Sequence, residues 1–201
     1  EMKEGAMAIL HNRGLSWVFL FAILVTFFLM PVSVLFPLMT LQHFGGTSYQ
    51  AGLIEVLWGV GALVGGAIMG ARVYKVNRVV MVNIMYLIVG LTFLLSGLLP
   101  PSGFVWFAIL TALAGVSGAV YNSAFTGIVQ TSVDPGTLGR VFSMFYTFSL
   151  MPCMLGLIGV GFLADNLGLA NSFIACGSII MLVGVLAFTT PSALRMDRQA
   201  K

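Results

Sequence analysis

The sequence is poor in charged residues: Asp, Glu, Lys and Arg make up only 7% of its 201 residues, whereas hydrophobic residues make up 59%. Soluble domains carry about 25% charged residues, so this composition excludes an ordinary soluble fold. The sequence also lacks segments of about 10 residues with alternating hydropathy, which excludes a transmembrane β-barrel. The composition therefore predicts a helical membrane protein.

Residues that carry catalysis or bind metals are scarce as well. The two cysteines, Cys153 and Cys176, lie in apolar segments and are expected to be packing residues. Residues 115–118 read G-V-S-G, as in intramembrane serine proteases, but that chemistry needs a later histidine as base, and none follows His43. Without metal-ligand clusters, phosphate-binding loops or basic runs with interleaved aromatics, we expect no enzyme activity, cofactor, metal or nucleic-acid partner.

Six hydrophobic segments follow one another, each long enough to cross a membrane as a helix of about 20 residues. They cover residues 15–42, 50–71, 78–99, 103–130, 139–164 and 170–190. Pro31 and Pro37 in the first segment and Pro152 in the fifth are expected to bend their helices. The sequence therefore predicts an all-α fold of six transmembrane helices.

The basic residues all fall at the chain ends or in alternate loops. They are Lys3, Arg13, Arg72, Lys75, Arg78, Arg140, Arg195, Arg198 and Lys201. The loops after the first, third and fifth segments contain no Lys or Arg. Because cytoplasmic loops carry the excess of basic residues, this pattern predicts a multi-pass protein of the inner (plasma) membrane with both termini in the cytoplasm.

Three helices followed by three helices suggest an internal repeat. The second segment ends in Gly66–Arg72 at the predicted inner face, and the fifth ends in Gly161–Gly168 at the outer face, as an inverted repeat would produce. Residues 1–14 lack an initiator Met at position 1 and read as a linker, so we expect more protein upstream. Residues 191–201 are expected to form a cytoplasmic tail.

Glu55 is the one carboxylate well inside a predicted span, where a charge is costly and usually faces a cavity or the bundle interior. It belongs to a stripe at helical spacing, the kind that lets helices approach closely. The stripe is Ala51, Glu55, Gly59, Ala62, Gly66 and Gly70. Two hypotheses stay open for Glu55: a proton-coupling group, or a carboxyl hydrogen-bonded to a neighbouring helix.

The fourth segment carries a second polar and small stripe, which includes Asn122 and Thr126. Asn122 must hydrogen-bond either to a packed helix or to something in a cavity, because hydrocarbon offers no partner. Met and aromatic side chains elsewhere can form an adaptable apolar pocket. The candidates for a substrate cavity are Met30, Phe36, Asn122, Thr126, Tyr146, Phe148 and Met151.

Residues 127–143, which read GIVQTSVDPGTLGRVFS, resemble the cytoplasmic loop between the tenth and eleventh helices of major facilitator transporters. They are most similar to the drug:proton antiporter branch that contains macrolide-efflux proteins. Gly66–Arg78 resembles the second-half copy of the conserved cytoplasmic loop of the family, without its usual acidic residue. Glu4–Gly14 resembles the end of the linker between the two six-helix halves, and Gly161–Gly168 resembles the branch's ending of the eleventh helix.

The resemblance implies the C-terminal half, helices seven to twelve, of a twelve-helix transporter built from 3+3 inverted repeats. Its partners would be the N-terminal six-helix half, membrane lipid, a small-molecule substrate and the proton. The residues it implies for a cytoplasmic gate are Arg72, Lys75, Arg78, Asp134 and Arg140. The expected function is proton-coupled export of macrolide-like or other amphipathic drugs by alternating access. Two alternatives remain: export of a metabolite or siderophore by the same fold, and a non-transport half-size membrane scaffold.

Overall fold

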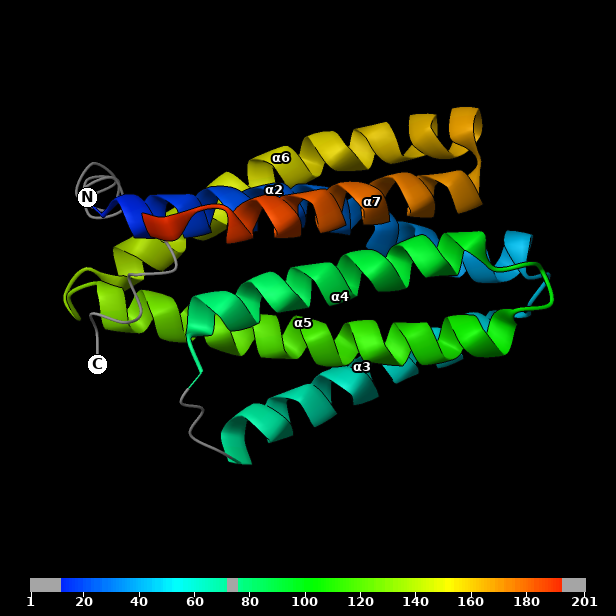
Figure 1. The fold of residues 1–201 in the computed structure, drawn as a ribbon. Coiled ribbons are helices and arrows are strands. Elements are labelled where there is room, and N and C mark those ends of the chain that lie inside the picture. The colour runs from blue at the N-terminus through cyan, green and yellow to red at the C-terminus, as the bar shows by residue number, and fades with distance from the viewer. Residues whose placement is uncertain (1–11, 72–75, 193–201) are drawn as a thin grey trace.

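The computed structural model describes residues 12–71 and 76–192. In the fifth long helix, the backbone is described but some side chains are not, namely those of residues 151–153, 155–158, 160–163 and 165. Every regular element in the described part is helical (Figure 1). The elements are α2 (Arg13–Leu38), the π-helical turn η1 (Met39–His43), α3 (Ser48–Ala71), α4 (Arg78–Leu98), α5 (Phe104–Ser132), α6 (Leu138–Leu167) and α7 (Leu169–Phe188). The predicted all-α fold of six long helices is confirmed.

Polar residues just before the helices fix where several of them begin. The Oδ1 atoms of Asn12 and Asn77 accept hydrogen bonds of 2.9–3.3 Å from backbone N–H groups in the first turns of α2 and α4. Before α3, the backbone N–H of Thr47 donates to Gln50 Oε1 (2.8 Å), and the N–H of Gln50 donates to Thr47 Oγ1 (3.4 Å). These caps supply partners for N–H groups that have none within the helix.

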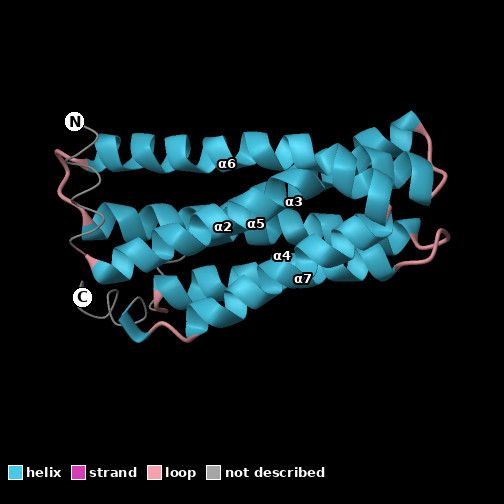
Figure 2. Ribbon diagram, turned by 90° about the horizontal axis from the view of Figure 1, so that it is seen from above, coloured by secondary structure: helices cyan, strands magenta, loops and turns pink. Residues whose placement is uncertain are grey.

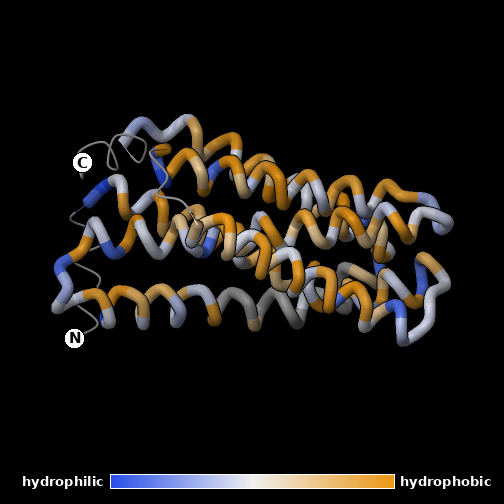
Figure 3. The backbone as a smooth tube through the Cα atoms, turned by 90° about the horizontal axis from the view of Figure 1, so that it is seen from below, coloured by the Kyte–Doolittle hydropathy of each residue, from blue (hydrophilic) through white to orange (hydrophobic). Residues whose placement is uncertain are grey.

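The lengths and composition of the helices suit a membrane. Among the described residues, five stretches are long and apolar enough to cross one: Arg13–His43, Ser48–Ala71, Arg78–Leu98, Phe104–Ser132 and Leu169–Phe188. Helix α6 has 30 residues, which is also long enough for a span. Apolar residues dominate the middle of the described helices, and hydrophilic ones gather toward the two ends of the bundle (Figure 3).

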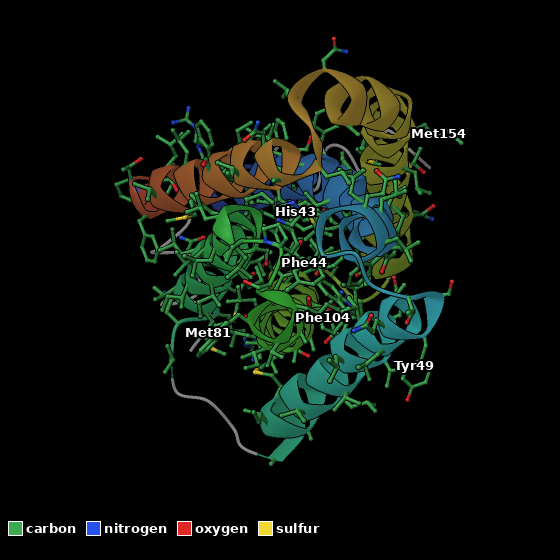
Figure 4. The ribbon with its side chains drawn as sticks, turned by 90° about the vertical axis from the view of Figure 1, so that its right-hand side faces the viewer. His43, Phe44, Tyr49, Met81, Phe104 and Met154 are labelled. Atoms are coloured by element: carbon green, nitrogen blue, oxygen red, sulfur yellow. The ribbon has the colours of Figure 1, made fainter. Side chains whose placement is uncertain are left out.

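The helices pack as an open arc in the order α3, α5, α4, α7, α2, α6. Helix α6 runs along one edge of the bundle (Figure 2), and α3 lies at another edge, where Tyr49 points away from the other helices (Figure 4). Exchanging the first three helices with the last three, α2 for α5, α3 for α6 and α4 for α7, reverses this order and leaves every main contact in place. The packing therefore has the two-fold character of the predicted inverted repeat.

Glycines let the helices of this arc approach closely. A Cβ atom added to Gly61 or Gly65 of α3 would collide with the backbone oxygens of Ala112 and Val116 in α5. At the centre of the arc, a Cβ at Gly177 of α7 would lie 2.5–2.7 Å from backbone atoms of α4. Close backbone approach at small residues is the main way in which helices associate in lipid.

Helix α2 continues past Leu38 into a π-helical turn, directly after Pro37. This turn brings His43 over the α4–α5 loop, where its Nε2 atom lies 2.9 Å from the carbonyl oxygen of Leu99. The His43 ring also contacts Phe44, whose ring in turn contacts Phe104 (Figure 4). This end of the bundle is therefore joined by contacts between α2, α4 and α5.

Candidate functional site

A cavity with a volume of about 550 Å³, called the main cavity below, lies inside the arc between α2, α3, α4, α5 and α6. Side chains from five helices line it, among them Met30, Trp58, Tyr86, Asn122, Phe142 and Ser149. Within the described residues, no Asp, Glu, Lys, Arg or His contributes to its wall. Pockets of about 300–1,000 Å³ with mostly apolar walls and a few polar groups hold drug-sized ligands.

A continuous row of aromatic rings forms one wall of this cavity. The row runs Tyr86, Tyr121, Phe125, Phe145, Tyr146, and successive ring centroids are 4.6–5.8 Å apart. It links α4, α5 and α6 across the arc. Aromatic pairs at these distances are favourable beyond the area they bury, so the row gives the cavity a stiff, polarizable surface.

A second aromatic cluster adjoins the cavity at Trp58. The Phe36 ring lies 5.4–5.8 Å from those of Trp58, Phe93, Phe107 and Phe173. Phe36 is only 5% exposed and, although predicted as a substrate-cavity residue, it lines not the main cavity but a smaller one that shares wall residues with it. Its ring is used in core packing because α2, α3, α4, α5 and α7 all meet there.

Glu55 lies beside a smaller cavity of about 200 Å³ between α2, α3 and α5. The two cavities share three wall residues, Leu29, Met30 and Trp58. Glu55 is exposed, and no described residue of this chain forms an ion pair or hydrogen bond with it. The carboxylate therefore borders a cavity that adjoins the main one through these three side chains.

The face of α3 that packs on α5 differs from the predicted small-residue stripe. The packed face contains Ile54, Gly61 and Gly65, whereas a Cβ atom added at Gly59, Gly66 or Gly70 would meet no atom within 4 Å. The prediction of which stripe makes the close contact is wrong, because α3 is apolar around most of its circumference and carries glycines on two faces. Glu55 consequently sits beside the contact with α5 rather than within it.

Four of the seven cavity candidates line the main cavity: Met30, Asn122, Thr126 and Tyr146. Phe148 is 45% exposed and lies outside its wall, and the side chain of Met151 is outside the described residues. The sequence reasoning missed Trp58, Tyr86 and Ser149. The sequence does show that Tyr86 and Ser149 carry polar atoms in the middle of a span. It does not show which side of their helices faces the cavity.

The gate candidates that the structure describes, Arg78, Asp134 and Arg140, lie at the end of the bundle where α2 begins and α7 ends. Arg78 Nη1 donates to the carbonyl oxygen of Gly127 (3.0 Å) and to Thr131 Oγ1 (3.2 Å), which ties the start of α4 to the end of α5. Asp134 begins the α5–α6 turn, where its carbonyl oxygen accepts a bond from the Thr137 N–H (2.9 Å). Arg140 is exposed in the first turn of α6. Arg72 and Lys75 lie outside the described residues.

Comparison with known proteins gives matches over nearly the whole chain. Residues 7–200 match the family model of the Major Facilitator Superfamily. Macrolide efflux protein A of Streptococcus pyogenes is 31% identical over 186 residues, which are 92% of this chain and 46% of that protein. The protein of the same name from Enterococcus faecalis is 32% identical over 157 residues, covering 78% of this chain and 49% of that protein.

A third relative is more distant but is aligned over more of the chain. Multidrug efflux pump Tap of Mycobacterium tuberculosis (strain ATCC 25618 / H37Rv) is 28% identical over 205 residues, which cover 98% of this chain and 46% of the pump. The chain spans about half the length of the curated relatives it matches. These relatives are efflux transporters and not enzymes.

Proposed function

The chain belongs to the Major Facilitator Superfamily, and we propose that it forms the C-terminal half, helices seven to twelve, of a proton-coupled drug exporter. It is a multi-pass membrane protein. In the proposed orientation, the protein lies in the inner membrane, and the end with Arg13, Arg78 and Arg140 faces the cytoplasm, because basic loops stay on the cytoplasmic side. Residues 1–14 would end the linker from an N-terminal six-helix half, and residues 191–201 would form a cytoplasmic tail.

The observation that carries the proposal is the 550 Å³ cavity with its aromatic wall and few polar groups. An apolar body fits the aromatic row, and polar substituents fit the hydroxyls and amide between the rings. The named relatives, two macrolide efflux proteins and a multidrug efflux pump, support an amphipathic drug as the solute. Alternation between two access states would then move the solute across the membrane.

Glu55 is the proposed proton-coupling residue. It is the one Asp or Glu that lies well away from the ends of a described helix, and it borders a cavity that shares wall residues with the proposed drug site. The competing interpretation is a carboxyl held by a hydrogen bond to a neighbouring helix. Among the described residues of this half, the Glu55 carboxylate has no such partner. Proton binding at Glu55 would neutralise a charge beside the cavity and so favour one access state over the other.

Macrolide accumulation in an efflux-deficient bacterium tests the proposed function. Cells that express the full-length transporter should accumulate less macrolide than cells without it, and a protonophore should restore accumulation. Unchanged accumulation, with the protein present in the membrane, would contradict drug export. It would then favour the alternatives, a metabolite or siderophore as solute or a non-transport scaffold.

Charge reversal at Arg140 tests the proposed cytoplasmic gate. In the full-length transporter, Arg140→Glu is expected to reduce macrolide efflux about tenfold, because a gate contact worth about 1.4 kcal/mol would favour one state by that factor. Arg13→Glu is the matched control, since it makes the same charge change at the same end of the bundle in a residue not assigned to the gate. Wild-type efflux by Arg140→Glu would remove Arg140 from the gate.

A further inference from the structure

Two hydroxyl groups in the wall of the main cavity are buried and make no well-aligned hydrogen bond within the described residues. Tyr86 on α4 is 2% exposed, Ser149 on α6 is 6% exposed, and both side chains line the 550 Å³ cavity. Within the described residues, Ser149 Oγ has no partner and Tyr86 Oη forms no well-aligned hydrogen bond, although the Tyr121 side chain is close enough to Tyr86 to interact with it electrostatically and as an imperfect hydrogen-bond partner. The two residues lie on different helices, and the aromatic row of Tyr86, Tyr121, Phe125, Phe145 and Tyr146 runs from α4, which carries Tyr86, to α6, which carries Ser149.

Other buried hydroxyls in the spans are satisfied by their own helices. Those of Thr40, Thr92, Ser96, Thr111, Ser117 and Ser172 each donate to a backbone carbonyl three or four residues earlier, at 2.7–3.1 Å. A serine in a helix can readily make this bond. Ser149 does not make it, so its hydroxyl is available to whatever occupies the cavity.

Leaving such groups unpaired is costly at membrane depth, where the surroundings offer no hydrogen bonds. A void of about 10 Å³ next to Tyr86 and Asn83 has room for at most one water molecule. Asn83 Nδ2, which also borders this void, has no hydrogen-bond partner among the described residues. One water molecule in that void would be shared with Asn83. That water molecule would not reach Ser149, because Ser149 lines the main cavity and not the small void.

We propose that the Tyr86 and Ser149 hydroxyls are two hydrogen-bonding points for the transported solute. These two hydroxyls select molecules that carry oxygen acceptors or hydroxyls on an apolar frame. This inference rests on the proposed export function and specifies its solute class: polyoxygenated, amphipathic compounds. The aromatic row between the two points contacts the apolar body. A ligand without hydrogen-bonding atoms leaves both hydroxyls unpaired, and a site with buried polar groups discriminates against such ligands.

Equilibrium binding of erythromycin, a macrolide rich in hydroxyl, carbonyl and ether oxygens, to the purified full-length transporter tests the proposal. Tyr86→Phe and Ser149→Ala should each raise Kd about five- to tenfold, the usual effect of one buried hydrogen bond. The double variant should raise Kd by about the product of the two factors, since the hydroxyls contact different atoms of the ligand. Thermal unfolding without ligand should shift by less than about 2 °C, because neither hydroxyl makes a well-aligned hydrogen bond within the described residues.

Two matched variants control for the loss of a hydroxyl elsewhere. Tyr49→Phe removes one from a side chain that is 81% exposed at the edge of the bundle, and Ser96→Ala removes a buried one that donates to the carbonyl oxygen of Thr92. Neither should change Kd. If wild-type protein binds and exports erythromycin but Tyr86→Phe or Ser149→Ala leaves Kd unchanged, the two-point assignment is wrong and the export function stands. If wild-type protein neither binds nor exports it, the export function fails and this inference fails with it.

Discussion

Replacement of Glu55 by glutamine is expected to abolish proton-driven drug transport while leaving the protein folded. Glutamine has nearly the same shape and can still hydrogen-bond, but it cannot bind and release a proton at neutral pH. With one proton exchanged per drug molecule, each unit of pH difference drives about a tenfold concentration ratio of drug, since a factor of ten corresponds to about 1.4 kcal/mol. In the Glu55→Gln variant, a pH difference should no longer produce this concentration ratio of drug.

Two assays on proteoliposomes with the full-length transporter separate coupling from transport itself. Drug exchange without a pH gradient should persist in Glu55→Gln, because the cavity wall does not include this residue. Drug uptake driven by an imposed pH gradient should disappear. Glu55→Asp, which keeps an acid at the position, should retain part of the driven uptake. Driven uptake at the wild-type level in Glu55→Gln would show that the proton is carried elsewhere.

Valine at Gly61 or Gly65 is expected to have the largest effect on folding. The added side chain would collide with the backbone oxygens of Ala112 or Val116, and backbone atoms of a helix cannot rotate away as a side chain can. Overpacking of this kind costs about 3 kcal/mol or more where the neighbours cannot relax. We therefore expect α3 to separate from α5 and little folded protein to be recovered.

Gly52→Val is the matched control on the same helix, since a Cβ atom at Gly52 meets nothing within 4 Å. Its stability should stay within about 0.5 kcal/mol of wild type, as for most exposed substitutions. The measurement is the thermal unfolding midpoint of the full-length protein in detergent, together with the fraction that elutes as a single species. A Gly65→Val protein as stable as Gly52→Val would mean that the close α3–α5 contact is not required.

The number and order of the helices could be predicted because the physical demand on them is simple. A segment of about 20 apolar residues is needed to cross hydrocarbon, and Asn77 before Arg78 illustrates how a capping residue marks where the next helix starts. The inverted repeat was also predicted, from the similar ends of the second and fifth segments at opposite faces. The evidence for it, however, lies in contacts such as α3 with α5 and α2 with α6, which no local pattern contains.

The facing of each helix was harder to predict. In a soluble helix the polar side faces water, but a membrane helix is apolar on its lipid side and on its protein side, so residue type alone says little about rotation. On α3, two different glycine faces were available, and the structure uses Gly61 and Gly65 rather than Gly59 and Gly66. Tyr86 was missed for the same reason: its contact with the cavity depends on how α4 packs against α5.

The most direct test of the central claim is movement of labelled macrolide into proteoliposomes that contain the wild-type full-length transporter and an imposed pH gradient. We expect accumulation of the drug that rises with the gradient and collapses when nigericin dissipates it. Accumulation that is the same with and without the gradient, or the same as in liposomes without protein, would contradict proton-coupled drug export by this fold.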